Sequence, residues 1–359
     1  MKHFLWVTIF AGLLIFNCSS SKTNPPSNAQ NVRLPGIPGQ LGSTVSGEAD
    51  GLIRVEPKSS YQEIYLLDSI RVVIDDPYVT EGLFDAPRIL ILYALPNGNS
   101  IEWTMGKQKN ETDDWHFNIQ YTDAQIKWLR QNTPERYTVA YLEAPHRSWP
   151  AWKRSHPDHG EMITQVIDSL RSLYPQARVI LNSHSGGGSF VNGFIESQAQ
   201  IPGWIKRIGF IDSNYGYTAE IGVKIETWLN SDQNNQLTVF AYNDSIALYE
   251  GKPLVSATGG TWYRSRMMRE DLGQKRTLVK TALKTGIIQY RSDDEQVLIL
   301  LKENPSRGIF HTEQVELNGF IHSLLFGSAY ENAGYEYFGD RIYDQYIQVD
   351  TPAFCRFSP

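Results

Sequence analysis

The chain has 359 residues, of which 41% are hydrophobic and 12% aromatic. A single large domain with insertions accounts for this length, and the apolar content excludes disorder for most of the chain. The 33 basic and 39 acidic residues give a net charge of −6, and no run of Lys or Arg forms a stripe that would neutralise phosphates. We therefore expect no nucleic-acid partner.

The N-terminus has the pattern of a targeting segment. Lys2 precedes an apolar run from Phe4 to Phe16, which is too short to cross a bilayer as a permanent helix. The run leads into Ile15-Phe16-Asn17-Cys18, which resembles the lipobox of bacterial lipoproteins, with Asn17 at a position where a small residue is usual. The resemblance implies a signal peptide over residues 1–17 and lipidation of Cys18. The alternative is an ordinary signal peptide that ends near a chance cysteine.

The next residues predict a tether between this anchor and the fold. Residues 18–45 are rich in Ser, Asn, Pro and Gly, a composition that stays flexible. We therefore expect an exported protein that is lipid-anchored to a bacterial membrane, at the outer membrane or the periplasmic face, or that is otherwise secreted.

Residues 46–359 alternate between strand and helix patterns. Two extended stretches, Leu52–Val55 and Ile70–Ile74, predict an antiparallel edge. Apolar runs of strand type follow at 88–95, 137–142, 178–181, 207–212, 237–242 and 297–301, with helical periodicity at 123–131, at 159–173 and from 190 onward. This alternation predicts an α/β fold with a mainly parallel sheet and helices on both faces.

The connection before the last strand is unusually long. It covers about residues 250–295 and contains a charged helical stretch near 267–284, so we interpret it as an insertion or lid within the same domain. Its many Arg, Lys, Glu and Asp residues argue against a broadly apolar lid.

Where the strand at 178–181 meets the following helix, Ser185 has a small residue two positions before it and another two positions after it. Ser183-His184-Ser185-Gly186-Gly187 fits the pattern small-x-nucleophile-x-small, with Ser183 where glycine is more usual. Over residues 85–330 the chain thereby resembles the α/β-hydrolase superfamily. The resemblance implies that fold, with Ser185 as the nucleophile. The alternative is a Gly/Ser-rich start of a helix without chemistry.

The resemblance also implies a base and an acid after later strands. His311 follows the last predicted strand and is preferred over His322, which lies in a helical pattern. Asp244 follows the penultimate strand, the usual superfamily position for the acid, and is ranked first. Asp212 ends the preceding strand, a position that some lipases use. Either aspartate could instead be a turn residue.

Acyl transfer needs hydrogen-bond donors for the oxygen that becomes negative. The resemblance implies the backbone N–H of Gly186 and a second donor from the loop after the first parallel strand, either Asn97 or Gly98. A plain β-turn would use the same loop residues.

Together these residues predict an exported serine hydrolase that cleaves a small-molecule or cell-envelope ester. The charges between residues 250 and 295 predict a preference for short or polar acyl groups over activation at a lipid interface. We expect no cofactor and no metal. Two alternatives stay open: a catalytically silent binding lipoprotein with the same fold, and a serine peptidase.

Overall fold

A computed structural model describes residues 59–356 of the chain except 68, 78–87, 114–118 and 284–285. The leader, Cys18, the tether and the predicted strand Leu52–Val55 lie outside the described residues, so these parts of the sequence analysis stay predictions. Within the described residues, no helix is both long and apolar enough to span a membrane.

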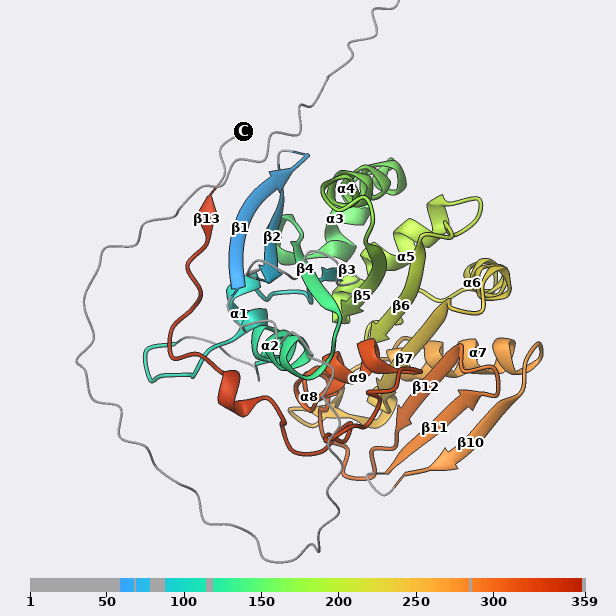
Figure 1. Cartoon of the computed structure of the whole chain (residues 1–359). Coiled ribbons are helices and arrows are strands. Elements are labelled where there is room, and N and C mark those ends of the chain that lie inside the picture. Colours follow the sequence, from blue (N-terminus) through green and yellow to red (C-terminus); the bar gives the residue numbers. More distant parts are fainter. Residues whose placement is uncertain (1–58, 68, 78–87, 114–118, 284–285, 357–359) are drawn as a thin grey trace, which may run out of the picture. The chain divides into compact units, whose positions relative to one another are not determined.

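The centre of the fold is one large sheet (Figure 1). Among the described residues its strands run in the order β13-β1-β2-β4-β3-β5-β6-β7-β12-β11-β10. Their bounds are β1 Ser59–Leu66, β2 Ile70–Pro77, β3 Arg88–Ala94, β4 Arg136–Glu143, β5 Arg178–His184, β6 Ile205–Ile211, β7 Gln236–Tyr242, β10 Leu278–Ala282, β11 Ile287–Ser292, β12 Val297–Lys302 and β13 Cys355–Arg356. The neighbours from β4 to β12 pair in parallel, and antiparallel strands flank them. The predicted mainly parallel sheet is confirmed.

Helices cover both faces of the sheet, and two apolar cores result. The helices are α1 Ile101–Met105, α2 Thr122–Asn132, α3 Trp149–Ser155, α4 His159–Leu173, α5 Gly188–Ser197, α6 Ala219–Ser231, α7 Thr261–Gly273, α8 Glu313–Glu316 and α9 Gly319–Leu325. One core lies under α3 to α7 and the other under α1, α2, α8 and α9. Strand β3 serves both, because Leu90 and Leu92 face the first core while Ile91 and Tyr93 face the second.

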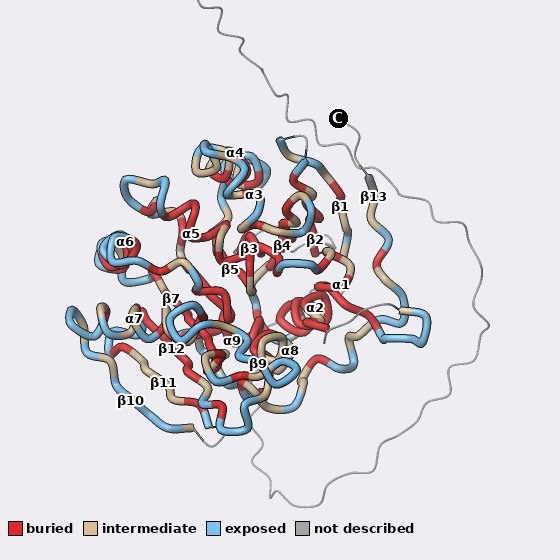
Figure 2. Tube along the Cα trace, turned by 180° about the vertical axis from the view of Figure 1, so that it is seen from behind, coloured by how far each residue is buried: buried red, intermediate tan, exposed pale blue. Residues whose placement is uncertain are grey.

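Burial follows this layering. Figure 2 shows buried residues along the central strands and on α2, and exposed residues along the outer sides of α4, α6 and β10. The central strands therefore read as nearly continuous apolar runs, which is why the sequence predicts them well. Strand β1 is different, because the positions of Ser59–Leu66 other than the buried Glu63 are half-buried or exposed.

The segment 250–295, which the sequence analysis interprets as an insertion or lid, contributes helix α7 and strands β10 and β11 to the fold. Helix α7 contacts β7, β12 and α6, and its Met268 and Leu272 are completely or almost completely buried in the core. Strands β10 and β11 extend the sheet beyond β12. The charged helix predicted to reach residue 284 ends at Gly273, because Leu278–Ala282 pairs as an edge strand with β11.

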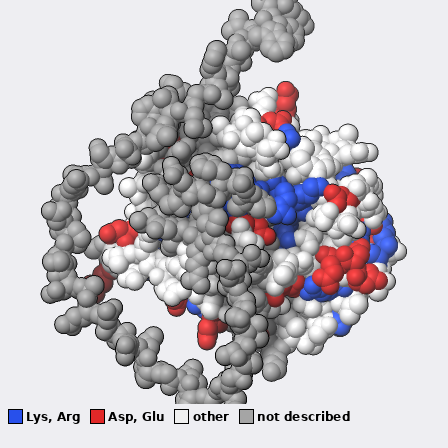
Figure 3. Space-filling model, in the orientation of Figure 1, with Lys and Arg blue, Asp and Glu red and all other residues white. Residues whose placement is uncertain are grey.

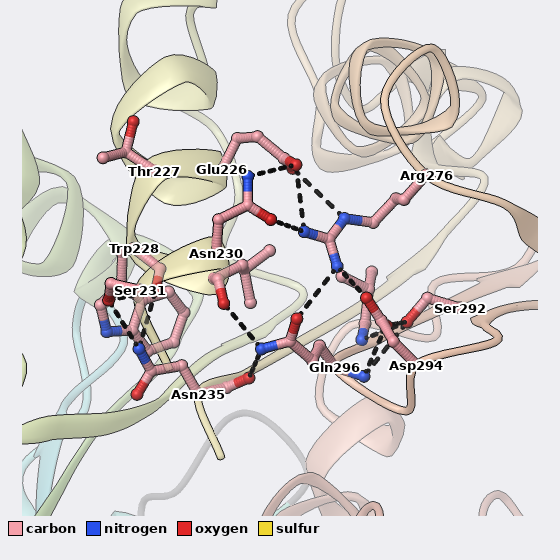
Figure 4. A network of polar contacts seen from close by, with 12 residues as sticks. Glu226, Thr227, Trp228, Asn230, Ser231, Asn235, Arg276, Ser292, Asp294 and Gln296 are labelled. Carbon is pink, nitrogen blue, oxygen red and sulfur yellow. Dashed lines mark hydrogen bonds and ion pairs between the residues drawn. The ribbon is translucent and has the colours of Figure 1, made fainter. Parts of the chain in front are cut away.

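A polar network ties this segment to its surroundings (Figure 4). The Arg276 guanidinium lies 3.1 Å from a Glu226 carboxylate oxygen on α6 and 2.7 Å from an Asp294 oxygen after β11. The Gln296 side-chain amide donates to the carbonyls of Leu229, Asp232 and Asn235 at 2.8 to 3.0 Å. These bonds join α6, the end of α7 and the start of β12, so the position of α7 is held at its C-terminal end.

The charges of the described surface are mixed in sign. On the face seen in Figure 3, a basic patch and an acidic patch adjoin each other on the side that carries α7 and β12. Many of the charges are paired, as in Lys206–Asp232 at 2.7 Å. Exposed pairs of this kind contribute little to stability.

Candidate active site

The turn after β5 carries Ser185 in a strained backbone conformation. Strand β5 ends at His184, and Ser185 has a φ of 53° before the chain enters α5. A positive φ is unfavourable for a residue with a Cβ, and such strain is found mostly where it serves a functional site. The turn places the half-buried Ser185 at the carboxyl end of a central parallel strand. This is the strand-turn-helix arrangement that the sequence predicts around Ser185.

Steric crowding explains the three glycines that follow. A Cβ on Gly186 would lie 2.1 Å from Asn97 Oδ1, and one on Gly187 would lie 2.1 Å from the Ala94 carbonyl oxygen. A Cβ on Gly188 would lie 1.8 Å from the Ser213 carbonyl oxygen. The turn is therefore pressed against the ends of both neighbouring strands, and only glycine fits at Gly187 and Gly188, where the clash is with backbone.

Ser183, which stands where glycine is more usual, connects β5 to the loop after β6. Its hydroxyl lies 2.8 Å from the Ser213 hydroxyl, and Ser213 Oγ also donates to the Ser183 carbonyl at 3.1 Å. Because Ser213 follows Asp212 directly, this contact fixes the strand that carries the serine relative to the loop that carries the aspartate.

His311 is hydrogen-bonded to Asp212. The distance between His311 Nδ1 and Asp212 Oδ2 is 2.5 Å. The Asp212 side chain has no exposed surface, whereas 26% of the His311 side chain is exposed. Asp212 has a φ of 45°, so Ser185 and Asp212, the residues that directly follow β5 and β6, both adopt the left-handed conformation. A buried carboxylate on Nδ1 leaves Nε2 as the nitrogen that can accept a proton.

The Asp212 contact changes the acidity of His311. Burial by itself lowers the pKa of His311, but the negative charge and the hydrogen bond of Asp212 outweigh it, so the pKa lies above its ordinary value. The charge of Asp244 acts in the same direction. Asp212 therefore stabilises the protonated imidazole, as an orienting carboxylate must.

Asp244 contacts Thr261 instead of His311. Its Oδ2 accepts a hydrogen bond from the Thr261 backbone N–H at 2.8 Å, at the first turn of α7. Burial and the nearby Asp212 charge raise the pKa of Asp244 to about 6. The sequence ranks Asp244 before Asp212 as the acid, but Asp212 is the aspartate that contacts His311. The physical reason is that Asp244 accepts a hydrogen bond at the N-terminus of α7 and thereby caps this helix.

The two loop residues considered as oxyanion donors differ in availability. The Gly98 N–H donates to the Arg147 carbonyl at 2.9 Å, so it is already used. Asn97 is exposed, and its side-chain amide lies over the α-carbon of Gly186. The structure thus brings Asn97 to Gly186 and leaves Gly98 directed elsewhere.

Sequence reasoning missed His184, the residue directly before Ser185. Its Nε2 lies 3.1 Å from the His311 carbonyl oxygen, and the two rings are 4.5 Å apart. Burial and the proximity of His311 hold the pKa of His184 well below its ordinary value, so the neutral ring donates its Nε2–H to that carbonyl. The rival base His322 lies inside α9, stacked on Tyr337, with its Nδ1 3.1 Å from the Tyr335 hydroxyl.

The strand order, the crossover helices on both faces and the strained turn after β5 together decide the fold. The chain has the α/β-hydrolase fold. Neither a family model nor a curated protein sequence matches it.

Solved structures similar to the chain include two esterases and a peptidase. A thermostable esterase has 13% identity and a TM-score of 0.44, with 73% of this chain and 60% of that chain covered. The acylaminoacyl peptidase of Pyrococcus horikoshii has 11% identity and a TM-score of 0.38, with 81% and 44% covered. A brefeldin A esterase, a bacterial homologue of human hormone-sensitive lipase, has 12% identity and a TM-score of 0.34, with 80% and 79% covered. The chain thus spans 60% and 44% of the length of the first two.

The effect of Asp212 on His311 can be measured directly. In protein labelled with ¹³C at histidine, NMR titration should give His311 a pKa above the ordinary value of about 6.5. Asp212→Asn should lower it, because the negative charge that outweighs burial is lost. The exposed carboxylate of Asp344 provides the control, since Asp344→Asn should leave the His311 pKa unchanged. An unchanged pKa in Asp212→Asn would contradict the assignment.

Proposed function

We propose that the chain is a serine hydrolase that cleaves a carboxylic ester, with Ser185 as nucleophile, His311 as base and Asp212 as the orienting acid. The observation that carries the proposal is the bond between His311 Nδ1 and the fully buried Asp212, on the sheet edge where the strained Ser185 lies. The predicted leader and lipidated Cys18 would place this activity outside the cytoplasm.

The proposed reaction has two steps. His311 Nε2 accepts the Ser185 hydroxyl proton while Ser185 Oγ attacks the ester carbonyl carbon. The Gly186 N–H and Asn97 donate to the oxygen that becomes negative. His311 then returns the proton to the leaving alcohol. Water attacks the acyl-enzyme by the same route in reverse, which releases the acid and restores Ser185.

The loops beside His311 carry apolar side chains that are open to solvent. Ile246 and Tyr249 follow β7, and Ile309 precedes His311 by two positions; they are 36%, 57% and 38% exposed. The two loops are joined, because the Leu248 N–H and the Arg307 Nε donate across them at 3.1 Å. Apolar surface next to the reacting groups supports an ester with an apolar acyl chain.

The proposed apolar acyl chain differs from the short or polar acyl groups that the sequence analysis predicts. That inference rested on the charges between residues 250 and 295. The charged residues from Arg264 to Arg276 lie on or directly after α7, which packs on a face of the sheet, and Arg276 is tied to Glu226 and Asp294. The charges on α7 therefore give no information about the polarity of the loops beside His311.

Covalent labelling tests the nucleophile. A fluorophosphonate should modify Ser185 in the full chain, and mass spectrometry should locate the adduct on the peptide that contains it. Ser185→Ala should remove the label, while Ser189→Ala, a half-buried serine at the start of α5, should keep it. Absence of any label on folded protein would favour a catalytically silent binding protein. Labelling at another residue would refute Ser185.

The length of the acyl chain tests the apolar loops. We expect kcat/KM for p-nitrophenyl esters to rise from acetate to octanoate by roughly fourfold per buried methylene, as about 0.8 kcal/mol per CH₂ implies. The double variant Ile246→Ser/Ile309→Ser should flatten this rise, whereas Val223→Ser on α6, at an exposed position, should not. A rise that persists in the double variant would overturn the role of these loops. Efficient cleavage of a peptide amide with negligible ester turnover would indicate a peptidase.

A further inference from the structure

Thr261, the first residue of α7, contacts both buried aspartates. Its hydroxyl donates a very short hydrogen bond to Asp212 Oδ1, and its backbone N–H donates to Asp244 Oδ2 at 2.8 Å. The hydroxyl oxygen also lies 3.2 Å from Asp244 Oδ2. Since His311 binds Asp212 Oδ2, both oxygens of Asp212 are engaged.

The position of Thr261 is fixed by its surroundings. Thr261 has no exposed surface, and a Cβ on the preceding Gly260 would lie 2.1 Å from Asp244 Oδ2. Glycine at 260 thus lets Asp244 approach the start of the helix. Met268 and Leu272 anchor the middle and the end of α7 in the core, and Arg276 ties the residues after it to α6. The hydroxyl is therefore presented by a rigid element.

The two buried carboxylates require a hydrogen-bond donor at the position of the Thr261 hydroxyl. Asp212 and Asp244 are both buried, and both have an oxygen close to the same hydroxyl. Without that hydroxyl, Asp212 Oδ1 would be a buried anionic acceptor that faces a second carboxylate. Burial and the charges of the two aspartates raise the pKa values of Tyr215 and Tyr242, so these phenols stay neutral and add no further negative charge.

We propose that Thr261 is a positioning residue for the hydrolytic site. Its hydroxyl holds the second oxygen of Asp212, so that helix α7 sets the orientation of the Asp212 carboxylate and, through it, of the His311 ring. Asp244 acts one step further away, because it caps the helix that presents Thr261. The inference rests on the proposed function, since it assigns Thr261 to the same site.

Three variants of the full chain test this role. Thr261→Val keeps the shape but removes the hydroxyl, Thr261→Ser keeps the hydroxyl, and Thr281→Val makes the same change at an exposed position on β10. Esterase kcat is expressed per active site, counted by fluorophosphonate titration, so that partial unfolding does not enter the result. Thr261→Ala is a second variant without the hydroxyl, for use where valine prevents folding.

Thr261→Val should lower kcat by about tenfold or more and change KM little, because the loss of a donor to a buried charge affects the catalytic groups and not substrate binding. Thr261→Ser should stay within about threefold of the wild type, and Thr281→Val should match it. Equal kcat in Thr261→Val and wild type, or equal losses with serine and valine, would overturn the inference. Failure of the proposed function would differ, since the wild type itself would then lack labelling at Ser185.

Discussion

A carboxylate that is fully removed from water needs hydrogen-bond donors on its oxygens, and the arrangement around Asp212 follows from that need. His311 supplies one donor and Thr261 the other. Each donor comes from a different part of the chain: His311 from the loop after β12, and Thr261 from the start of α7. The site therefore depends on the correct packing of segments about 50 and 100 residues away from Asp212.

A second constraint is the close approach of the turn that carries Ser185 to the neighbouring strands. Gly186, Gly187 and Gly188 have no room for a Cβ, because Asn97, the end of β3 and the Ser213 backbone lie against them. The hydroxyls of Ser183 and Ser213 join the same two segments. Strand β5 is thus locked between β3 and β6, and the strained backbone of Ser185 is maintained by packing on both sides.

The sequence predicts the sheet and the serine turn because both are local signals. Buried parallel strands are continuous apolar runs, and the run of small residues around Ser185 is visible without knowledge of the fold. The order of the two aspartates is not a local signal. Asp212 and Asp244 end adjacent parallel strands, so both reach the same edge of the sheet. The distinction depends on α7, whose N-terminus binds Asp244 and whose first side chain binds Asp212. The sequence does not predict β1, β10 and β11, which lie at or next to the ends of the sheet, because half-buried and exposed positions prevail in them and no continuous apolar run results.

The central claim is that Asp212, rather than Asp244, orients the catalytic histidine. The most direct measurement is esterase kcat/KM for Asp212→Asn and Asp244→Asn, compared at equal folded fraction. We expect a loss of about 10⁴-fold for Asp212→Asn, as for the acid of a catalytic triad. Asp244→Asn should lose less than about tenfold, because the asparagine carbonyl can still accept the Thr261 N–H. A large loss in Asp244→Asn with near-normal turnover in Asp212→Asn would contradict the account.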